Sequence, residues 1–298
     1  MCVEYNADLV LIYDKFSIGK NLVIVRFLER DYVITNSLRK KIVGLVVVSL
    51  IISLGVYSIL LYINLKNIIV ANQEEHISRL AVASCREISL WLDAKKMEIS
   101  AVADSVSLMD GNYTAIRGRL KRHAKRNPTY EMLFYADTKG NSFSSSDFKA
   151  NIVDRVYFQQ ALNTGQEIVS DPLISRQSNN PIIAIAVPVK KGNLITGVVG
   201  CTISLNYLSE LISHIRPVDT GYAFVIQEDG TTIFHPDKQL ILKHNILKDP
   251  HIDPSLKDAV NKMVNRQTGL TTYVYENTIK YLAYAPIQGT NWSLAINA

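Results

Sequence analysis

The pattern of apolar and polar positions shows one uninterrupted apolar run, then a long stretch with helical period, then a region with alternating period. The apolar run is Ile42 to Ile63, and it contains no charged residue. A helix needs about 20 consecutive apolar residues to cross a bilayer. A helix in a protein core normally has a polar face, whereas this run has only scattered Gly, Ser and Tyr. We therefore predict a transmembrane helix over residues 42–63.

Positive charge on one side of this run predicts its orientation. Arg39, Lys40 and Lys41 directly precede it, and basic residues beside a span favour the cytoplasmic side. We expect a cytoplasmic tail of residues 1–41 and, beyond the cell membrane, an extracytoplasmic region after Ile63. Residues 1–38 lack the layout of a signal peptide because the apolar run begins so late, and we assign them no function.

A stretch with helical period follows, from about Leu65 to Ser107, without Pro or Gly. Its apolar residues recur mostly at intervals of three, four or seven, which places them on one face. At 1.5 Å per residue, about 40 residues reach about 60 Å, too long for a helix inside one small domain. We predict a stalk helix over 64–110 that pairs in a parallel homodimer. The predicted dimer face contains Ile77, Leu80, Ile88 and Trp91.

The remaining chain predicts an α+β fold that repeats one arrangement. A short basic helix, Tyr113 to Lys125, comes first, and then apolar residues alternate with polar ones. FYADTKGNSF and FVIQEDGTTIF are both a strand, an acidic turn with Gly, and a strand. We predict two tandem modules, 111–216 and a smaller 217–298, each an antiparallel sheet with helices on it. The predicted strands are 132–136, 141–145, 182–189, 194–204, 222–227, 231–235, 270–275, 278–286 and 292–296, and the predicted helices are 157–163, 205–215 and 254–265.

Composition and charge exclude several classes of function. The net charge is +5 over 298 residues, and the basic residues are spread along the chain apart from 39–41 and 117–126, so we infer no nucleic-acid binding. The six histidines show neither HExxH nor paired Cys/His spacing, and we expect no metal, no cofactor and no catalytic residue. A membrane-anchored hydrolase would need a nucleophile–base pair, which we do not find. Three cysteines do not make a disulfide framework, although a single Cys85–Cys201 bridge stays open.

Several short stretches carry a resemblance to a known family. They are DRVYFQQA (154–161), VSDP (169–172), residues 183–200, GYAF (221–224), HPD (235–237), YAP (284–286) and TNWS (290–293). With the span and the stalk, the chain resembles, over about 42–298, the double Cache sensor domain of bacterial transmembrane receptors, most like methyl-accepting chemotaxis receptors. The resemblance implies two tandem PAS-like modules, a small ligand in the membrane-distal one, and a homodimer that signals to a cytoplasmic output module outside this sequence. The same sensor on a histidine kinase or a diguanylate cyclase stays open.

Arg155 is the residue most suited to hold a ligand, because its planar guanidinium matches a carboxylate. In the amino-acid receptors of this family, the resemblance implies, an Arg at this place holds the ligand carboxylate and aromatic neighbours close the pocket. The alternative is a structural Arg paired with Asp154 or Asp171. The candidate ligand-binding residues are Arg155, Tyr157, Phe158, Tyr135, Ser170, Asp171, Ser175 and Cys201.

The sequence departs from the amino-acid pattern of that family at the positions that would bind an amine. Leu173 and Ser175 stand where the pattern has an aromatic residue and an acid, and Cys201 stands where it has an acid on the late strand. Ala150 and Tyr157 replace two further aromatic residues of the pattern. Burying an ammonium group without an acid is costly. We therefore expect a small organic acid, with a carboxylate and no amine.

Overall fold

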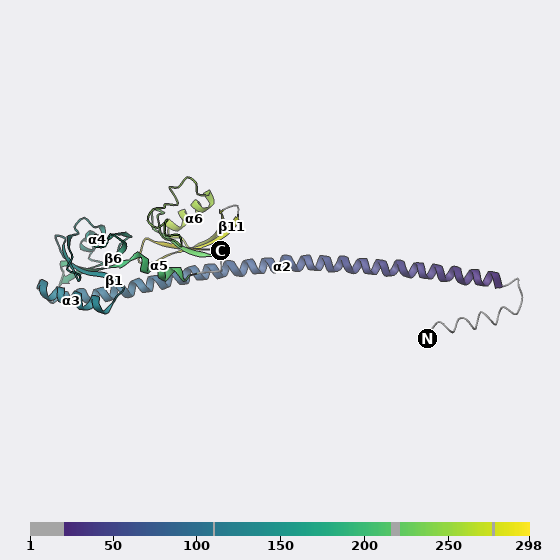
Figure 1. Cartoon of the computed structure of the whole chain (residues 1–298), viewed down its shortest axis with the longest axis horizontal. Helices are drawn as coiled ribbons and strands as arrows, with labels where there is room; N and C mark the ends of the chain where they lie inside the picture. Colours follow the sequence, from purple (N-terminus) through teal and green to yellow (C-terminus); the bar gives the residue numbers. More distant parts are fainter. Residues whose placement is uncertain (1–20, 110, 216–220, 276–277) are drawn as a thin grey trace. The chain divides into compact units, whose positions relative to one another are not determined.

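The computed structural model describes residues 21–109, 111–215, 221–275 and 278–298, with the backbone alone for 21–37. The chain divides into two units, residues 1–70 and 71–298, which we describe separately. One helix, α2 (Asn21–Ser107), begins in the first unit and ends in the second (Figure 1).

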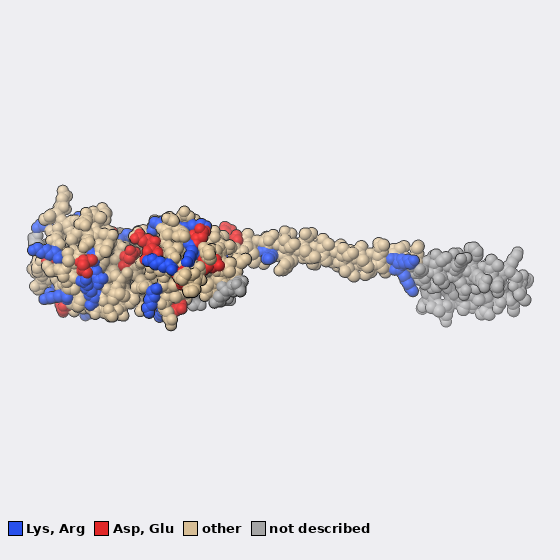
Figure 2. Space-filling model, turned by 90° about the horizontal axis from the view of Figure 1, so that it is seen from above, with Lys and Arg blue, Asp and Glu red and all other residues tan. Residues whose placement is uncertain are grey.

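In the first unit, α2 is apolar and exposed. The described side chains from Leu38 to Ile69 are all exposed, and the most apolar window of this helix has a mean hydropathy of 2.5. Within the described ranges, α2 alone is long and apolar enough to cross a membrane. Between the basic cluster Arg39–Lys41 and Lys66 its sequence contains no charged residue, and Figure 2 shows an unbroken tan surface over this stretch. The predicted span therefore lies within a continuous helix, while the first 20 residues of the predicted tail lie outside the described ones.

In the second unit, the predicted helical stretch up to Ser107 is confirmed as part of α2, but the predicted dimer face is wrong. Ile77 and Ile88 are 1% and 4% exposed because they pack in the unit's own core. Leu80 and Trp91 pack against the same core, and the Trp91 ring stacks on Tyr207 at 6.0 Å. The apolar stripe of the helix covers the two sheets of its own chain and is not free for a partner.

The first module begins with α3 (Tyr113–Arg126), which Asn112 caps by accepting a hydrogen bond from Ala115 N. Its antiparallel sheet has the order β3-β2-β1-β7-β6-β4, and β5 also pairs with β6. Gly165, at φ 64°, ends α4. The elements are β1 (Tyr130–Asp137), β2 (Asn141–Ser144), β3 (Lys149–Asn151), α4 (Val156–Thr164), β4 (Ile168–Val169), β5 (Leu173–Ile174), β6 (Pro181–Lys191), β7 (Leu194–Ser204) and α5 (Leu205–Ser213).

The second module repeats this strand order in a smaller sheet, β10-β11-β12-β8-β9. In both sheets the first strand lies between its hairpin partner and the last strand. The prediction of two copies of one module, the second smaller, is therefore confirmed. The elements are β8 (Tyr222–Ile226), β9 (Thr232–Phe234), α6 (Pro254–Val264), β10 (Gly269–Tyr275), β11 (Thr278–Pro286) and β12 (Ser293–Asn297).

The two faces of each sheet belong to different cores. Alternate residues of a strand point to opposite faces. One face of both sheets packs on α2 in a shared core, while the other face packs on α4 in the first module and on α6 in the second. Helices α4, α5 and α6 and most strands agree with the prediction within three residues at each end, whereas β3, β4 and β5 were not predicted because two or three residues show no period.

The structure shows how tightly β7 packs at Gly200 and whether Cys85 and Cys201 form a disulfide. A Cβ atom at Gly200 would lie 2.6 Å from Ile185 O and would also meet the Phe134 ring. β7 therefore packs closely against β6 and the Phe134 ring at this position. Cys85 and Cys201 are free thiols, so the bridge left open does not form. Burial raises the pKa of Cys85 to about 12, despite a backbone hydrogen bond that lowers it.

Candidate functional site

A small cavity in the first module, here called the strap cavity, lies between the sheet and the segment 173–180, here called the strap. Its volume is only about 30 Å³, roughly that of one water molecule in the liquid. Its floor is apolar and includes Met132, Phe134 and Ile182. Its polar lining consists of four hydroxyl residues, a phenol and two arginines: Ser142, Ser144, Ser175, Thr202, Tyr157, Arg155 and Arg176.

Hydrogen bonds hold the strap down over this cavity. Ser175 Oγ donates to Glu131 Oε1 at 2.9 Å. Arg176 pairs with Asp154 at 2.5 Å and also donates to Asn151 O. Arg155 Nη2 donates to Ile174 O at 3.1 Å. Contacts made by side chains therefore hold the strap at the rim of the cavity, and these contacts can exchange for contacts with a ligand.

Arg155 occupies the N-cap position of α4, in extended backbone, and its side chain does not cap the helix. The guanidinium is therefore available to the strap and to the cavity. Within the described chain, no ion pair joins Arg155 to Asp154 or Asp171. Desolvation raises the pKa of Asp154, but Arg176 and, more weakly, the nearby Arg155 lower it. Asp154 takes Arg176 as its partner, and Asp171 accepts a hydrogen bond from Trp292 Nε1 at 3.1 Å. Within the described part of the chain, Arg155 has a backbone carbonyl as its hydrogen-bond partner and no carboxylate.

Two other groups give the strap cavity its chemistry. Burial raises the pKa of Tyr157 to about 12, against nearby arginines that lower it, so its hydroxyl stays a neutral donor. Thr202 is 1% exposed, and its Oγ1 has no hydrogen-bond partner among the described residues. An unpaired buried hydroxyl costs roughly 1–3 kcal/mol. The cavity therefore contains an unsatisfied polar atom that a bound molecule could satisfy.

The structure brings together only part of the predicted set. Arg155, Tyr157 and Ser175 line the strap cavity. Phe158 is fully buried in the core beneath α4. Tyr135 and Cys201 point to the opposite face of the sheet, where both belong to the core on α2. They are not cavity residues.

Thr202 is the residue that the sequence reasoning missed. It is the neighbour of Cys201 on β7, and a shift of one residue along a strand changes the face. In β7 the polar Thr202 stands between Cys201 and Ile203, and this alternation could have indicated that it faces the cavity. Because both faces of the strand are mostly apolar, the pattern did not show which face binds the ligand.

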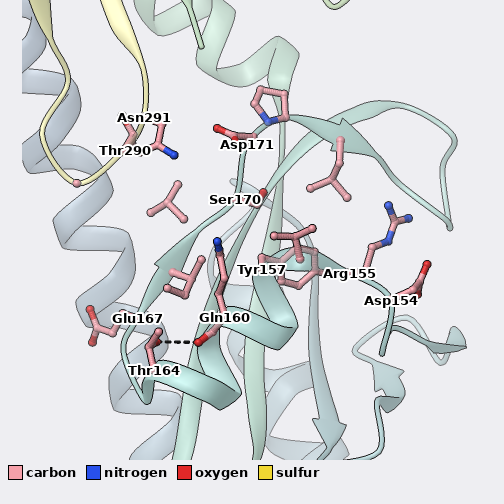
Figure 3. Close-up of a pocket in the computed structure, with 16 residues that line it drawn as sticks. Asp154, Arg155, Tyr157, Gln160, Thr164, Glu167, Ser170, Asp171, Thr290 and Asn291 are labelled. Atoms are coloured by element: carbon pink, nitrogen blue, oxygen red, sulfur yellow. Dashed lines mark hydrogen bonds between the residues drawn. The ribbon is translucent and has the colours of Figure 1, made fainter. Parts of the chain in front are cut away.

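A larger cavity, here called the inter-module cavity, lies beside the first and has a volume of about 640 Å³. Figure 3 shows Gln160, Thr164 and Glu167 on one side of it, Ser170 and Asp171 above, and Thr290 and Asn291 of the second module across from them. Ser170 Oγ accepts a hydrogen bond from Ala184 N at 2.8 Å. The predicted residues Ser170 and Asp171 therefore line this cavity and not the one beneath the strap, whereas Arg155 and Tyr157 line both.

The described residues contain no group of three or more His, Cys, Asp or Glu side chains that could hold a metal ion. Both cavities of the first module are instead lined by hydrogen-bonding and aromatic groups. This arrangement suits reversible binding of a small polar molecule.

Comparison with known proteins places this geometry in a family. The chain is 23% identical over 266 residues to the methyl-accepting chemotaxis protein PscA of Pseudomonas syringae pv. tomato. The aligned region covers 86% of this chain and 40% of PscA. The chain thus spans less than half of that relative. Among solved structures, the ligand-binding domain of the Pseudomonas fluorescens chemoreceptor CtaA in complex with L-isoleucine matches with a TM-score of 0.65 and 22% identity, over 78% of this chain and 94% of that one.

A histidine kinase has the same fold. The extracellular domain of the putative histidine kinase mmHK1S-Z2 matches with a TM-score of 0.66 and 16% identity, over 76% of this chain and 97% of that one. The sequence profile of the Cache domain matches residues 65–298, which is well over half of the chain. The chain therefore belongs to the Cache domain family and has the double Cache architecture of bacterial receptor sensor domains.

Proposed function

We propose that residues 71–298 sense a small carboxylate, which Arg155 binds in the strap cavity. The observation that carries this proposal is the Arg155 guanidinium, without a carboxylate partner in the described chain, beside the unpaired buried hydroxyl of Thr202. A carboxylate can accept hydrogen bonds from both groups and from the Tyr157 hydroxyl. The ligand named for CtaA, L-isoleucine, also bears a carboxylate.

The lining of the strap cavity favours an organic acid over an amino acid. Among the described residues that line it there are two arginines but no Asp or Glu. An amino group buried there would lack an anionic partner, which is costly. Because the cavity now holds about 30 Å³, the ligand enters when the strap moves away and the Arg176–Asp154 contact opens. Binding is therefore coupled to the position of the strap, as a sensor requires.

Calorimetry on the full chain in detergent, with acetate, lactate, succinate and L-isoleucine as probes, tests this proposal. We expect an organic acid to bind more tightly than L-isoleucine. Losing one partner of a buried charge-assisted hydrogen bond costs about 2–5 kcal/mol, so Arg155→Ala should weaken binding at least about 30-fold. Arg155→Lys should restore it only in part, because an ammonium lacks the planar fork.

The matched control is Arg122→Ala, which removes the same charge from an exposed position of α3 outside both cavities. It should bind like the wild type. If Arg155→Ala binds the acid as tightly as the wild type does, Arg155 is not the carboxylate site.

The same proposal places the sensor in a membrane receptor. Arg39–Lys41 before the apolar part of α2 support a cytoplasmic N-terminus and extracytoplasmic modules. The likeness to PscA supports a chemotaxis receptor as the output, and mmHK1S-Z2 supports a histidine kinase as the second candidate. Protease added to spheroplasts should digest residues 71–298, and complete protection would contradict this topology. The reading frame downstream distinguishes the two outputs.

The exposed face of α2 supports a parallel homodimer through a different strip from the one predicted. Ala83, Leu90, Ala94, Met97 and Ala101 are exposed and follow one another at intervals of seven, four, three and four. This is the spacing of a two-helix seam. In a chain without its three native cysteines, Leu90→Cys should crosslink between subunits, whereas Ile88→Cys, which is buried, should not. Equal crosslinking at both positions would contradict this seam.

A further inference from the structure

The second module contains a preformed cavity of about 250 Å³, here called the aromatic cavity. This volume corresponds to about eight water molecules, enough for a small ring compound. It lies apart from Arg155 and shares no lining residue with the strap cavity. Six of its lining residues have aromatic rings, on β8, on β10 or in the segment after β9: Tyr222, Phe224, His235, His244, Tyr273 and Tyr275.

Hydrogen bonds and ring contacts fix the walls of the aromatic cavity. The Tyr222 and His235 rings meet edge to face, with centroids 5.0 Å apart, and Phe224 lies 6.4 Å from His235. Asn297 joins two walls, because its Oδ1 accepts from Tyr222 N at 2.9 Å and its Nδ2 donates to Tyr273 Oη at 3.2 Å. The rings are thus held in place before any ligand arrives, which lowers the entropic cost of binding.

Two histidines supply one donor and one acceptor. His235 Nδ1 accepts from Asp237 N at 3.0 Å, so a neutral His235 ring carries its proton on Nε2. His244 lies 2.9 Å from Asp249 through Nε2, which donates to the carboxylate and leaves Nδ1 as an acceptor in the neutral ring. Burial lowers the pKa of His235, against the opposing effect of Asp237. Its ring therefore stays neutral near pH 7.

The charge of the lining decides the class of ligand. Among the described residues, neither Lys, Arg, Asp nor Glu lines the aromatic cavity. A carboxylate would have no cationic partner there. A cation could bind the rings through their π faces, but Lys280 Nζ already lies 5.1 Å from the centre of the Tyr275 ring. A second positive charge at this wall is therefore disfavoured.

We propose that the aromatic cavity is a second ligand site, which takes a neutral, flat heteroaromatic compound of the nucleobase type. The ring of the ligand stacks on Tyr275 and Tyr222, and its edge accepts from His235 Nε2 and donates to His244 Nδ1. This site is additional to the carboxylate site of the first module, so the receptor would combine two chemically unrelated signals. The two proposals can be tested separately, because Arg155 does not line the aromatic cavity.

Calorimetry on the full chain in detergent tests the second site, with adenine as the probe and choline and benzoate as the charged comparisons. We expect adenine to bind, and choline and benzoate to bind at least about tenfold more weakly. Loss of one stacking ring should weaken adenine binding about tenfold in Tyr275→Leu. Loss of the His235 donor should weaken it about fivefold in His235→Leu. Arg155→Ala, as the matched control in the other module, should leave adenine binding unchanged.

Three outcomes would overturn the proposal. The first is that adenine does not bind the wild type. The second is that choline binds more tightly than adenine, which would make the rings a cation cage. The third is that adenine binding is lost in Arg155→Ala and kept in both His235→Leu and Tyr275→Leu, which would place it in the first module. Tyr275 is exposed, so Tyr275→Leu should fold like the wild type, and its circular dichroism spectrum checks this.

Discussion

The two modules have the same strand order but opposite kinds of cavity. Beneath the strap of the first module lies a small space of about 30 Å³ with hydroxyls and two arginines. Beside the sheet of the second lies a larger space of about 250 Å³ with aromatic rings and, among the described residues, no Lys, Arg, Asp or Glu. The repeated fold thus supplies the position of a site, while the side chains on one face of the sheet decide what it can bind.

The segments that cover the two cavities are held by different kinds of contact. In the first module, the strap 173–180 is held on the rim of the cavity by Arg155 and Arg176. In the second, backbone hydrogen bonds join the segment after β9 to β9 itself, where Thr232 N donates to His244 O at 2.9 Å and Leu242 N donates to Thr232 O at 2.8 Å. The first module can therefore change its cover when a ligand replaces the rim contacts, whereas the second presents a fixed pocket.

The largest expected effect comes from breaking the first sheet at Gly200. A Cβ atom there would meet Ile185 O at 2.6 Å and the Phe134 ring, which forms the floor of the strap cavity. Overpacking a core costs about 1–3 kcal/mol, and a backbone carbonyl can move little. Gly200→Ala should therefore lower the free energy of unfolding by about 2–3 kcal/mol, measured by urea denaturation.

Gly118→Ala is the matched control for this change. It lies inside α3, and its nearest neighbour beyond the helix backbone is the Arg122 side chain at 3.5 Å, an ordinary contact. Replacing Gly by Ala in a helix stabilises by about 0.5–1 kcal/mol. The two variants should thus shift stability in opposite directions. A Gly200→Ala protein as stable as the wild type would show that the first sheet can relax at this point.

A smaller effect is expected when one polar atom that lines the strap cavity is replaced. Thr202→Val removes the unpaired hydroxyl and keeps the shape of the side chain. We expect it to stabilise the protein by about 1 kcal/mol, because a buried polar group without a partner is lost. It should also weaken carboxylate binding about fivefold, because the ligand loses one hydrogen bond. Denaturation and calorimetry on the same preparation measure both effects.

Thr196→Val, on the same strand, is the control for Thr202→Val. Its hydroxyl donates to Val189 O at 3.3 Å, so its loss should destabilise slightly and leave ligand binding unchanged. If Thr202→Val lowers stability as Thr196→Val does, the Thr202 hydroxyl has a partner in solution and is not kept for a ligand.

The sequence predicts most of the fold because long elements have clear periods. The bounds of β7 and β11 agree with the prediction at every residue, since each is bounded by a turn or a helix start that the sequence marks. The strands β4 and β5 have only two residues each, too few for a period. They form because β6 offers them an edge, which is a tertiary cause.

The sequence predicts less of the site. It does not show which face of a buried strand binds the ligand, nor whether an apolar helix face packs on its own chain or on a partner. Arg155 was identified by the match of its guanidinium to a carboxylate, and Tyr157 as its aromatic neighbour in the family pattern; both line the strap cavity. Cys201 was chosen where Thr202 lines the cavity, because β7 is buried on both faces and its apolar pattern does not distinguish them. Likewise, the apolar stripe of α2 did not reveal whether it covers its own sheets or a partner.

The smallest expected effect concerns pH and the second module. Burial lowers the pKa of His235 in the folded chain, although Asp237 opposes this and His244 adds to it. The unfolded chain, with a histidine pKa of about 6.5, therefore binds the proton more readily than the folded chain does. The stability that this difference carries is fully present above pH 6.5 and is lost as the pH falls through the folded pKa.

The free energy of unfolding should therefore fall as the pH is lowered from 7.5 to 5.5, and His235→Leu should flatten that slope. His123, in the first module, also has a pKa lowered by burial, although Glu98 opposes this, so part of the slope should persist in His235→Leu and disappear in the double variant with His123→Leu. Urea denaturation at several pH values measures each slope. An unchanged slope in His235→Leu would mean that the His235 ring is as well solvated as in the unfolded chain. The aromatic cavity would then be wetter than its aromatic walls imply, and a neutral ring compound would gain little by entering it.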